Sequence, residues 1–370
     1  MKKLDVYIAK QIGVGFLLVA LSLMSMLWLT QSLKFVEMVT DKGLPVYMFI
    51  EMTSLLMPRV FTILSPIALF VAVMFVYNKL ITDSELIVMK AVGISSFVIA
   101  RAAIVVGVLL SLFNVYVLNY GIPLAEGKFR DLEYEVKNSF TKMMLREGTF
   151  TSFKNNMTVF IDKFNDDGSI EGILVSDGKN NYEKMITVAE KGMIEYTDIG
   201  PKILLRNGTR QVINKKSGQF SSMKFDDYVV DFGDVSVARK KKERAREKSL
   251  SELFEAANNP NLNDKERRAF KAEGHRRILA PIFNLLFALL ACVGLLISNF
   301  NRRGQGKVVL YSILMMIVIQ ALDMSLVNMA KRNEWIIGLM YLNCFVPLLG
   351  AISLLVKAPV SKKKKVSEVK

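Results

Sequence analysis

Long apolar segments alternate with polar stretches along the chain, and the apolar segments fall into two groups of three. Three lie before residue 123 and three after residue 276, with a long polar insert between them. A helix crosses the roughly 30 Å of bilayer hydrocarbon in about 20 residues, which is close to the length of each segment. A core helix of a soluble protein rarely stays uncharged for so long, so the pattern predicts an integral membrane protein. The segments are Ile12–Leu33, Val60–Tyr77, Ala102–Tyr120, Ile278–Phe300, Val308–Ala330 (interrupted by Asp323) and Trp335–Val356.

The polar insert, residues 124–275, changes its pattern twice. Residues 124–146 are charged and predict a helix that leaves the third apolar segment. From 148 to 236, short apolar and β-branched runs are separated by turn signals at intervals of about 8–12 residues, which is typical of a β-sandwich or jelly roll. Residues 239–275 are highly charged and predict a helical return to the membrane, in which Ser249 and Glu252 have the spacing of a capping box.

The predicted fold class is therefore membrane α-helical, with six transmembrane helices in a 3 + 3 arrangement and an inserted all-β domain that is jelly-roll-like. The parts are residues 1–123, with a short helix at about 82–93, the insert 124–275, and residues 276–370, which end in a basic tail. Two interpretations of the β domain stay open. It is either an ordinary packed domain or one whose interior holds or passes an apolar ligand, and the spacing of its strands does not separate the two.

The net charge of +15 is distributed unevenly over the short loops. Arg59 and Arg101, at the ends of spans, are left out of this count. If both termini are cytoplasmic, the short segments on that side carry 14 other Lys and Arg residues, whereas the short loops on the other side carry Lys34, Lys42, Lys331 and Arg332. Such an excess marks the cytoplasmic side of a membrane protein. The basic cluster at 239–246 then lies outside, which long translocated domains tolerate. The charge therefore predicts cytoplasmic termini and an outside insert, and not nucleic-acid binding.

Few side chains suit catalysis or metal binding. Cys292 and Cys344 both fall inside predicted spans, and His275 is the one histidine, interpreted as an interfacial residue beside two arginines. The loop 301–308 is the nearest approach to a Walker A phosphate loop, but it lacks the first glycine and the Ser or Thr after the lysine. We therefore expect no catalytic residue, no metal and no cofactor, and we expect any ATP hydrolysis to come from another chain.

A short helix is predicted between the second and third spans, at residues 82–93. Thr82 is the expected N-cap, Glu85 its partner in a capping box, and Gly93 the left-handed residue after the helix. Exposed apolar surface on such a helix usually marks a partner site. An apolar face resting on lipid headgroups, with Glu85 as a simple cap, explains the pattern equally well. The residues that share one face by their spacing are Glu85, Val88, Met89 and Val92.

The stretch Leu80–Ser95 closely resembles the coupling helix of the lipopolysaccharide export permeases, the LptF/LptG family. Its pattern, acidic-Ser-Glu-Leu-x-Val-Met-x-Ala-x-Gly after the second span, is specific, and weaker matches follow in the correct order along the whole chain. The aspartate before Ser84-Glu85 and the Arg-Arg-Gly-Gln-Gly loop look more like LptF than LptG. The weaker matches are Met57–Val60, Ser65-Pro66, Asn114–Pro123, Asn207–Arg210, Glu273–Ile278 and Asn301–Lys307.

This resemblance implies the function and the partners. Family members pair as LptF with LptG, bind an LptB-like ATPase dimer and associate with an LptC-like bridge protein. Lipopolysaccharide enters a cavity between the two permeases from the outer leaflet of the bacterial inner membrane and passes to periplasmic β-jelly rolls. The chain is thus expected to be a permease subunit of an ATP-driven lipopolysaccharide exporter. It would be multi-pass in the inner membrane, with both termini cytoplasmic and the inserted domain periplasmic.

The resemblance also assigns residues to these roles. Glu85 corresponds to the family glutamate that faces a groove of the ATPase. Family basic residues at the periplasmic end of the first span touch lipid A phosphates, and Lys34 is the nearest candidate here, followed by Lys42. The residues expected at the ATPase are Asp83, Ser84, Glu85, Val88, Met89, Val92 and Gly93. Those expected along an apolar substrate path in the β domain are Phe160, Ile161, Ile173, Leu204 and Val212.

Polar side chains inside the spans are the remaining candidates. Arg59, next to Pro58 at an end of the second span, either extends its guanidinium to the interface or serves the site. Asp323, with Gln320 and Asn328 in the fifth span, either pairs across the seam between two permeases or lines the cavity, because charged groups at such depth usually face protein or water.

Three other interpretations are weighed against this function. The chain could be the LptG-type paralogue of the same complex. It could be a mechanotransmission subunit, which moves its outer domain without passing substrate. A lipid-modifying membrane enzyme is the third, and the absence of convergent His, Cys or paired carboxylates within the spans argues against it.

Overall fold

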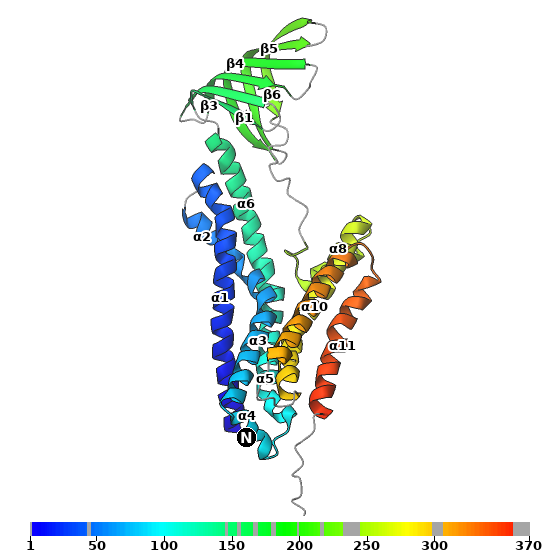
Figure 1. The fold of residues 1–370 in the computed structure, drawn as a ribbon. Coiled ribbons are helices and arrows are strands. Elements are labelled where there is room, and N and C mark those ends of the chain that lie inside the picture. Colours follow the sequence, from blue (N-terminus) through cyan, green and yellow to red (C-terminus); the bar gives the residue numbers. More distant parts are fainter. Residues whose placement is uncertain are drawn as a thin grey trace, which may run out of the picture. The chain divides into compact units, whose positions relative to one another are not determined.

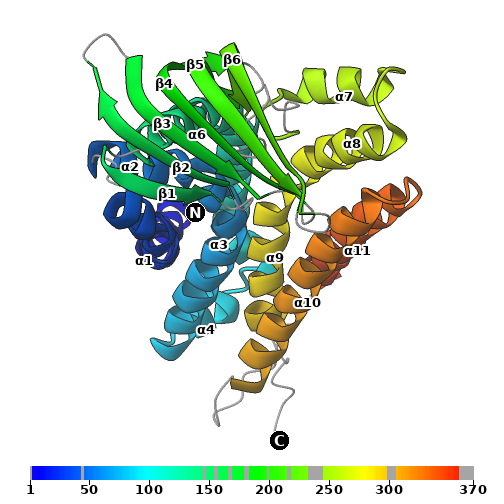
Figure 2. The same cartoon turned by 90° about the horizontal axis from the view of Figure 1, so that it is seen from above.

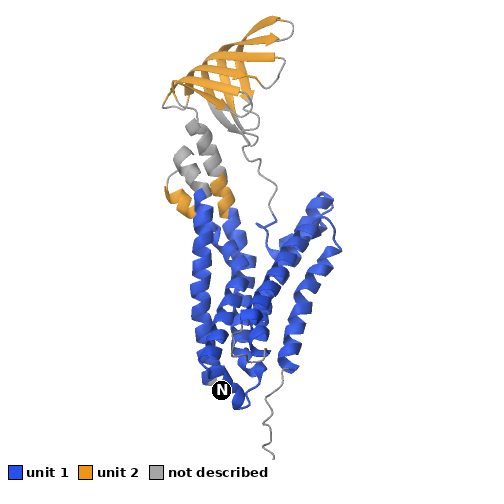
Figure 3. Ribbon diagram, in the orientation of Figure 1, with its two compact units in different colours: residues 1–33, 53–127, 244–370 blue, residues 34–52, 128–243 orange. Residues whose placement is uncertain are grey.

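The computed structural model describes residues 2–42, 46–144, 147–153, 157–165, 169–178, 183–197, 200–214, 218–231, 245–297 and 306–357. The chain divides into two compact units (Figure 3). Unit 1 comprises residues 1–33, 53–127 and 244–370, and unit 2 comprises residues 34–52 and 128–243. Each unit has its own hydrophobic core.

Membrane-length helices occur where the apolar segments predict them (Figure 1). Four of them are single α-helices: α1 (Lys2–Lys42), α3 (Met57–Thr82), α10 (Gly306–Ala330) and α11 (Ile336–Lys357). The third span runs without interruption from Ser96 to Glu133. It consists of α5 (Ser96–Tyr116), the π-helical turn η1 (Val117–Gly121) and the first part of α6 (Ile122–Met144). The predicted membrane α-helical fold class is confirmed.

The fourth predicted span is a bent pair of helices. Helices α8 (Asp264–Leu279) and α9 (Ile282–Ile297) meet at an angle of 46°. Pro281 lies at the break, where the missing N–H of proline interrupts the helical hydrogen bonds. The carbonyl of Pro281 accepts a hydrogen bond from Ser111 Oγ at 2.7 Å, so this polar group is satisfied inside the bundle. With this pair counted as one span, the described residues contain six.

Helix α9 forms the centre of unit 1. It packs against α3, α5, α10 and α11, and Figure 2 shows it between α3 and α10. Apart from Asn284, its side chains are apolar on all sides, as expected of a helix that is buried all round. In contrast, α1, α10 and α11 expose large apolar side chains such as Leu18, Tyr311 and Leu349, which suits contact with lipid or with another membrane protein.

Two buried hydrogen bonds join polar side chains of α3 to α5. Tyr77 Oη donates to the carbonyl oxygen of Ile99 at 2.7 Å, and Asn114 Nδ2 donates to Ser65 Oγ at 3.1 Å. In a bilayer an unsatisfied polar group costs several kcal/mol, so these bonds hold α3 against α5 in one register.

The insert folds as one antiparallel six-stranded sheet, which confirms the predicted all-β domain. The strands pair in sequence order from β1 to β6 (Figure 2). On β2, buried and more exposed residues alternate, which is the pattern of a sheet with one covered face. The strands are β1 (Thr149–Phe153), β2 (Met157–Phe164), β3 (Ser169–Asp177), β4 (Glu183–Thr197), β5 (Gly200–Asn214) and β6 (Phe220–Asp231).

Helices precede and follow the strands of the sheet in the sequence. Helix α6 is the predicted charged helix, and its Phe129 and Leu132 pack against a short apolar helix that was not predicted, α2 (Val46–Leu55). After the sheet, α7 (Leu250–Asn258) begins with the predicted capping box. The backbone N–H of Ser249 donates to Glu252 Oε2 at 2.8 Å, and that of Glu252 donates to Ser249 Oγ at 3.4 Å.

Candidate functional site

The segment between α3 and α5 contains a seven-residue helix, α4 (Glu85–Ala91). Its start differs from the prediction, because Thr82 is the last residue of α3 and donates to the carbonyl oxygen of Asn78 at 3.0 Å. Ser84 precedes α4 instead, in the left-handed conformation (φ 61°) and without a side-chain cap. The predicted capping box is therefore wrong, and the Glu85 carboxylate does not serve it.

The end of α4 is a Schellman motif. The N–H of Gly93 donates to the carbonyl of Lys90, and that of Ile94 donates to the carbonyl of Met89, both at 3.1 Å. Gly93 has a φ of 90°, so it is the left-handed residue that the sequence predicts. Glycine suits this position because its lack of a Cβ removes the strain that other residues meet there.

The faces of α4 differ in burial. Leu86 and Met89 pack into the core of unit 1, and Met89 is only 8% exposed. Val88 and Val92 are 61% and 76% exposed. Met89 therefore lies on the buried side, whereas its spacing predicts it on the open face. The open face of α4, defined here as Glu85, Val88 and Val92, combines an acid with apolar surface, which is typical of a partner site.

Two charged residues of α4 have opposite surroundings. The side chain of Glu85 makes no hydrogen bond or ion pair with any other residue that the structure describes. Lys90 donates from Nζ to the carbonyl oxygen of Leu296 at 2.6 Å, at the C-terminal end of α9. A helix C-terminus favours a cation, although burial lowers the pKa of Lys90 below its ordinary value. Lys90 therefore ties α4 to the central helix of unit 1.

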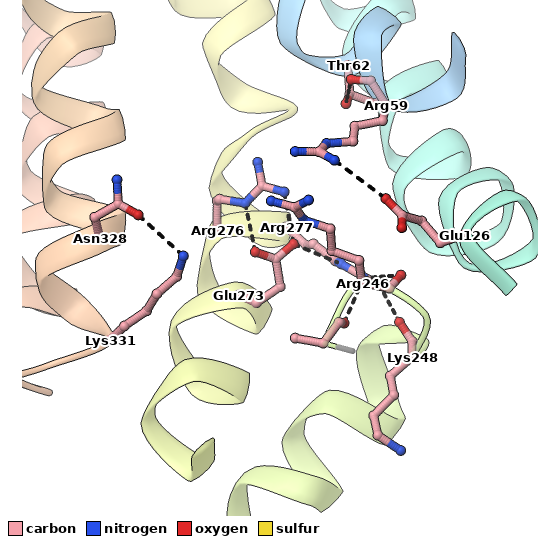
Figure 4. A network of polar contacts seen from close by, with 11 residues as sticks. Arg59, Thr62, Glu126, Arg246, Lys248, Glu273, Arg276, Arg277, Asn328 and Lys331 are labelled. Atoms are coloured by element: carbon pink, nitrogen blue, oxygen red, sulfur yellow. Dashed lines mark hydrogen bonds and ion pairs between the residues drawn. The ribbon is translucent and has the colours of Figure 1, made fainter. Parts of the chain in front are cut away.

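A cluster of charged side chains lies at the other end of unit 1 (Figure 4). Glu273 of α8 is buried and accepts two hydrogen bonds from Arg276, at 3.0 Å from Nε and 2.8 Å from Nη2. Arg277 Nε lies 3.7 Å from the same carboxylate. Spacings of three and four residues bring both arginines to the side of Glu273. The bidentate pair with Arg276 is a strong, directional contact.

Arg277 also fixes the chain that precedes α7. Its Nη1 donates to the carbonyl of Lys248 at 2.6 Å, and its Nη2 donates to the carbonyls of Arg246 and Ala245 at 2.9 and 3.1 Å. These three bonds hold residues 245–248 against α8. As a result, the Arg246 side chain is brought to the wall of a cavity beside the cluster.

This cavity has a volume of about 230 Å³ and lies between α3, α8, α9 and α10. One part of its wall is polar and another is apolar. Its charged and amide side chains are Arg246, Glu273, Arg276, Gln320, Asp323, Asn328 and Lys331. Its larger apolar side chains are Ile63, Pro66, Phe283, Met324 and Val327. Such a wall suits a ligand that has both a charged and an apolar part.

Arg59 lies at the edge of this cluster, one turn of α3 before the cavity wall at Thr62. Its Nη1 is 3.8 Å from Glu126 Oε1, which is an ion-pair distance but too long for a hydrogen bond. Within the described chain its guanidinium has no hydrogen-bond acceptor. Gln320 and Asp323, which the sequence names as candidates, thus line one cavity, and Arg59, a third candidate, lies beside the charged cluster next to it.

Four residues of the cluster are absent from the candidates that the sequence names: Arg246, Glu273, Arg276 and Arg277. A signal exists for three of them, because an acid followed by arginines three and four residues later, directly before an apolar span, predicts a charged group on one helical face. No local signal exists for Arg246, since its place depends on the contacts of Arg277 with a distant backbone segment.

The five residues predicted along a substrate path do not share one surface of the sheet. Ile161 and Ile173 are fully buried in the core of unit 2. Phe160 and Leu204 are neighbours of buried residues on their strands and so point to the opposite face. There the ring of Phe160 lies 4.8 Å from that of Phe150. Val212 is partly buried.

The remaining predicted residues lie in α1, beside α4 and in α8. Lys34 and Lys42 both belong to α1, but their side chains lie outside the described residues. Of the proposed ATPase contacts, Asp83, Ser84 and Gly93 are exposed beside α4. His275 Nδ1 lies 3.0 Å from Tyr341 Oη, so its ring is held between α8 and α11.

Comparison with known proteins identifies one family whose sequence model matches most of this chain. Residues 6–357 match the sequence model of the family described as "Lipopolysaccharide export system permease LptF/LptG". An uncharacterised protein of Rickettsia prowazekii (strain Madrid E), RP871, is 28% identical over 354 residues, which is 95% of this chain and 97% of that protein.

Two relatives with named functions are more distant. The permease protein LptF of Escherichia coli (strain K12) is 23% identical over 201 residues, or 54% of this chain and 55% of that protein. The permease protein LptG of Haemophilus influenzae (strain ATCC 51907) is 24% identical over 216 residues, or 57% of this chain and 59% of that protein. The chain therefore spans little more than half the length of each, and these similarities do not separate the two subunit types.

Proposed function

The chain belongs to the lipopolysaccharide export permease family LptF/LptG, and from that premise we propose that it is the LptF-type permease subunit of an ATP-driven lipopolysaccharide exporter. Family membership makes it a multi-pass membrane transport subunit rather than an enzyme. The aspartate at position 83 and the loop Arg302–Gly306 favour the LptF type. The LptG type is the alternative within the same complex.

The observation that carries this proposal is the open face of α4. In the proposed orientation both termini and α4 are cytoplasmic, where an LptB-like ATPase dimer would hydrolyse ATP. Glu85 lacks a partner among the described residues and is available to a basic side chain of the ATPase. Val88 and Val92 supply the apolar surface around it. A partly exposed acid within an apolar patch gives such a contact both affinity and orientation.

Movement of the ATPase would reach the other end of unit 1 through α9. Lys90 ties α4 to the C-terminal end of α9, and α9 continues through the bend at Pro281 into α8. Helix α8 carries the charged cluster around Glu273. A rigid element that contacts both regions is the physical requirement for passing work between them.

The substrate path is the second part of the proposal. Lipopolysaccharide carries several acyl chains and phosphates, so it needs an apolar cavity bordered by cations. The exposed apolar faces of α1 and α10 suit a cavity shared with an LptG-like permease, and Lys34 would supply part of its cationic border. The inserted sheet would lie in the periplasm, receive the acyl chains along an apolar interior and continue to an LptC-like bridge protein.

Co-purification tests this assignment. The tagged chain, extracted from its native inner membrane in mild detergent, should retain an ATPase and a second six-span permease. Val88→Asp places a second charge on the open face of α4 and should release the ATPase while the second permease stays bound. Val229→Asp, an equivalent change at an exposed position of β6, is the matched control and should retain both. Absence of both partners from the unmodified chain would contradict the proposal.

A further inference from the structure

The wall of the cavity carries more cations than carboxylates. The guanidinium groups of Arg246 and Arg276 and the amine of Lys331 line it, and Arg59 and Arg277 lie beside them in the charged cluster (Figure 4). The carboxylates of the wall are those of Glu273 and Asp323. Three cations therefore stand against two anions in the wall that the described residues form.

The pairing within the cluster is uneven. Glu273 is shared by Arg276 and Arg277, and the side chain of Arg59 has, among the described residues, only the long contact with Glu126. The Arg246 side chain has no hydrogen bond or ion pair with any described residue, although it lines the cavity. A guanidinium carries five N–H donors, so Arg246 presents open donors at the cavity and Arg59 presents open donors beside it.

Such an arrangement is costly unless an anion completes it. Like charges repel more strongly in surroundings that exclude water, and buried charges in proteins are normally paired. Water could solvate the arginines, but it would not cover the apolar wall formed by Phe283, Met324 and Val327. An amphiphile with a compact anionic group would pair with the cationic part of the wall and cover its apolar part.

We propose that this cavity binds one phosphate group of the exported glycolipid, with Arg246 and Arg59 as the open donors and Arg276 as a donor already oriented by Glu273. The inference rests on the proposed export function, which supplies the lipid. Phosphate is the anion that the planar fork of arginine matches best, because two N–H groups reach two oxygens at once. Arg277 and Glu273 are positioning residues, since they hold Arg246 and Arg276 in place.

The volume of the cavity sets how much of the lipid it takes. Sites for whole drug-sized ligands measure about 300–1,000 Å³, whereas this cavity measures about 230 Å³. It therefore accommodates one phosphate and part of the sugar that carries it. Gln320 and Asn328 offer hydrogen bonds to sugar hydroxyls, and Asp323 disfavours a second anion in the same space.

Binding measurements without ATP test the site. The probe is fluorescent bisphosphorylated lipid A, and its dephosphorylated form is the reference, each titrated into the permease complex in phosphatidylcholine nanodiscs. Arg246→Gln removes open donors but leaves the fold contacts, because Arg277 binds the backbone carbonyl of residue 246. Arg332→Gln removes the same charge from an exposed position next to Lys331 and is the matched control.

Arg246→Gln should weaken binding of the phosphorylated probe about 10- to 150-fold, the loss expected for charge-assisted hydrogen bonds. It should leave the dephosphorylated probe unchanged. Arg59→Gln should act in the same direction, and Arg332→Gln should have no effect. Equal affinity of the Arg246→Gln and Arg332→Gln variants for the phosphorylated probe would overturn the proposal.

Competition distinguishes the source of the phosphate. Displacement of the probe by millimolar inorganic phosphate, or binding of phosphatidylglycerol vesicles with the same dependence on Arg246, would show that the exported glycolipid is not the specific ligand and would overturn the proposal. These titrations use no ATPase activity. A negative result therefore leaves the contact at α4 intact, and loss of the ATPase in co-purification leaves the cavity result intact.

Discussion

Glu85→Gln isolates the charge at the proposed ATPase contact. The change keeps the size of the side chain and its ability to hydrogen-bond, and removes only the negative charge. In the structure Glu85 is the first residue of α4, caps nothing and has no partner among the described residues. Within the permease it therefore loses only its interaction with the helix dipole, worth about 0.3–1 kcal/mol for a group near the surface.

The cost in the complex should be much larger. Breaking a charge pair that is desolvated at an interface costs about 2–5 kcal/mol, which corresponds to an affinity about 30- to 5,000-fold lower. The assay is a titration of the purified ATPase onto the permease pair in nanodiscs, together with thermal unfolding of the permease alone. We expect Glu85→Gln to lower the affinity by at least about 30-fold and to leave the unfolding temperature nearly unchanged.

Asp83→Asn is the matched control. It removes the same charge two residues earlier, from a residue that does not share the face of Val88 and Val92, and should change the affinity less than Glu85→Gln does. Glu85→Lys should abolish binding, and an acidic substitution in the ATPase groove should restore it. Unchanged affinity of the Glu85→Gln permease would refute the charge pair, and an equal effect of Asp83→Asn would reduce it to a general effect of charge.

Three further predictions concern α4 and the sheet. Lys90→Met should lower the free energy of unfolding by about 1.5–3 kcal/mol at most, the value of a charge-assisted hydrogen bond, and should lower the amount of lipid transported per ATP hydrolysed. Lys90→Arg should retain the wild-type transport per ATP, and an unchanged ratio in the Met variant would show that Lys90 does not transmit movement from α4. Gly93→Ala should lower the free energy of unfolding by about 1–2 kcal/mol, because residue 93 has a positive φ, and should speed amide hydrogen exchange throughout α4. Unaltered exchange would contradict the role of the Schellman motif in stabilising α4. A photocrosslinker at Ile161 should capture lipopolysaccharide only with ATP, and one at Phe160 on the opposite face should not; capture at Phe160 alone would move the path to that face.

The spans and the sheet could be predicted because their causes are local in sequence. An uncharged run such as Ile12–Leu33 is long enough to cross hydrocarbon whatever surrounds it, and the short β-branched runs of the insert are separated by turn residues. The capping box at Ser249 and the left-handed Gly93 are equally local, since each depends on residues within a few positions. These predictions agree with the structure.

The failures concern packing between elements. The end of α3 is prolonged to Thr82, which no residue near Thr82 signals, and this removes the expected cap of α4. Met89 lies on the buried side because α4 packs against the core of unit 1, so helical spacing alone assigns it to the wrong face. The cavity could not be predicted, because its lining residues Ile63, Arg246 and Asp323 come from three distant segments that only the tertiary fold brings together.

The central claim is that ATP hydrolysis moves lipopolysaccharide through the spans of this chain. The most direct measurement uses proteoliposomes that contain the complete complex and lipopolysaccharide, with photocrosslinkers on α1 and α10 and a soluble β-jelly-roll acceptor. The account predicts crosslinks to lipopolysaccharide at both helices and transfer to the acceptor, both with ATP in the unmodified complex and neither in the Glu85→Lys complex. ATP hydrolysis that moves the inserted sheet without crosslinks or transfer would contradict it and would establish a mechanotransmission subunit instead.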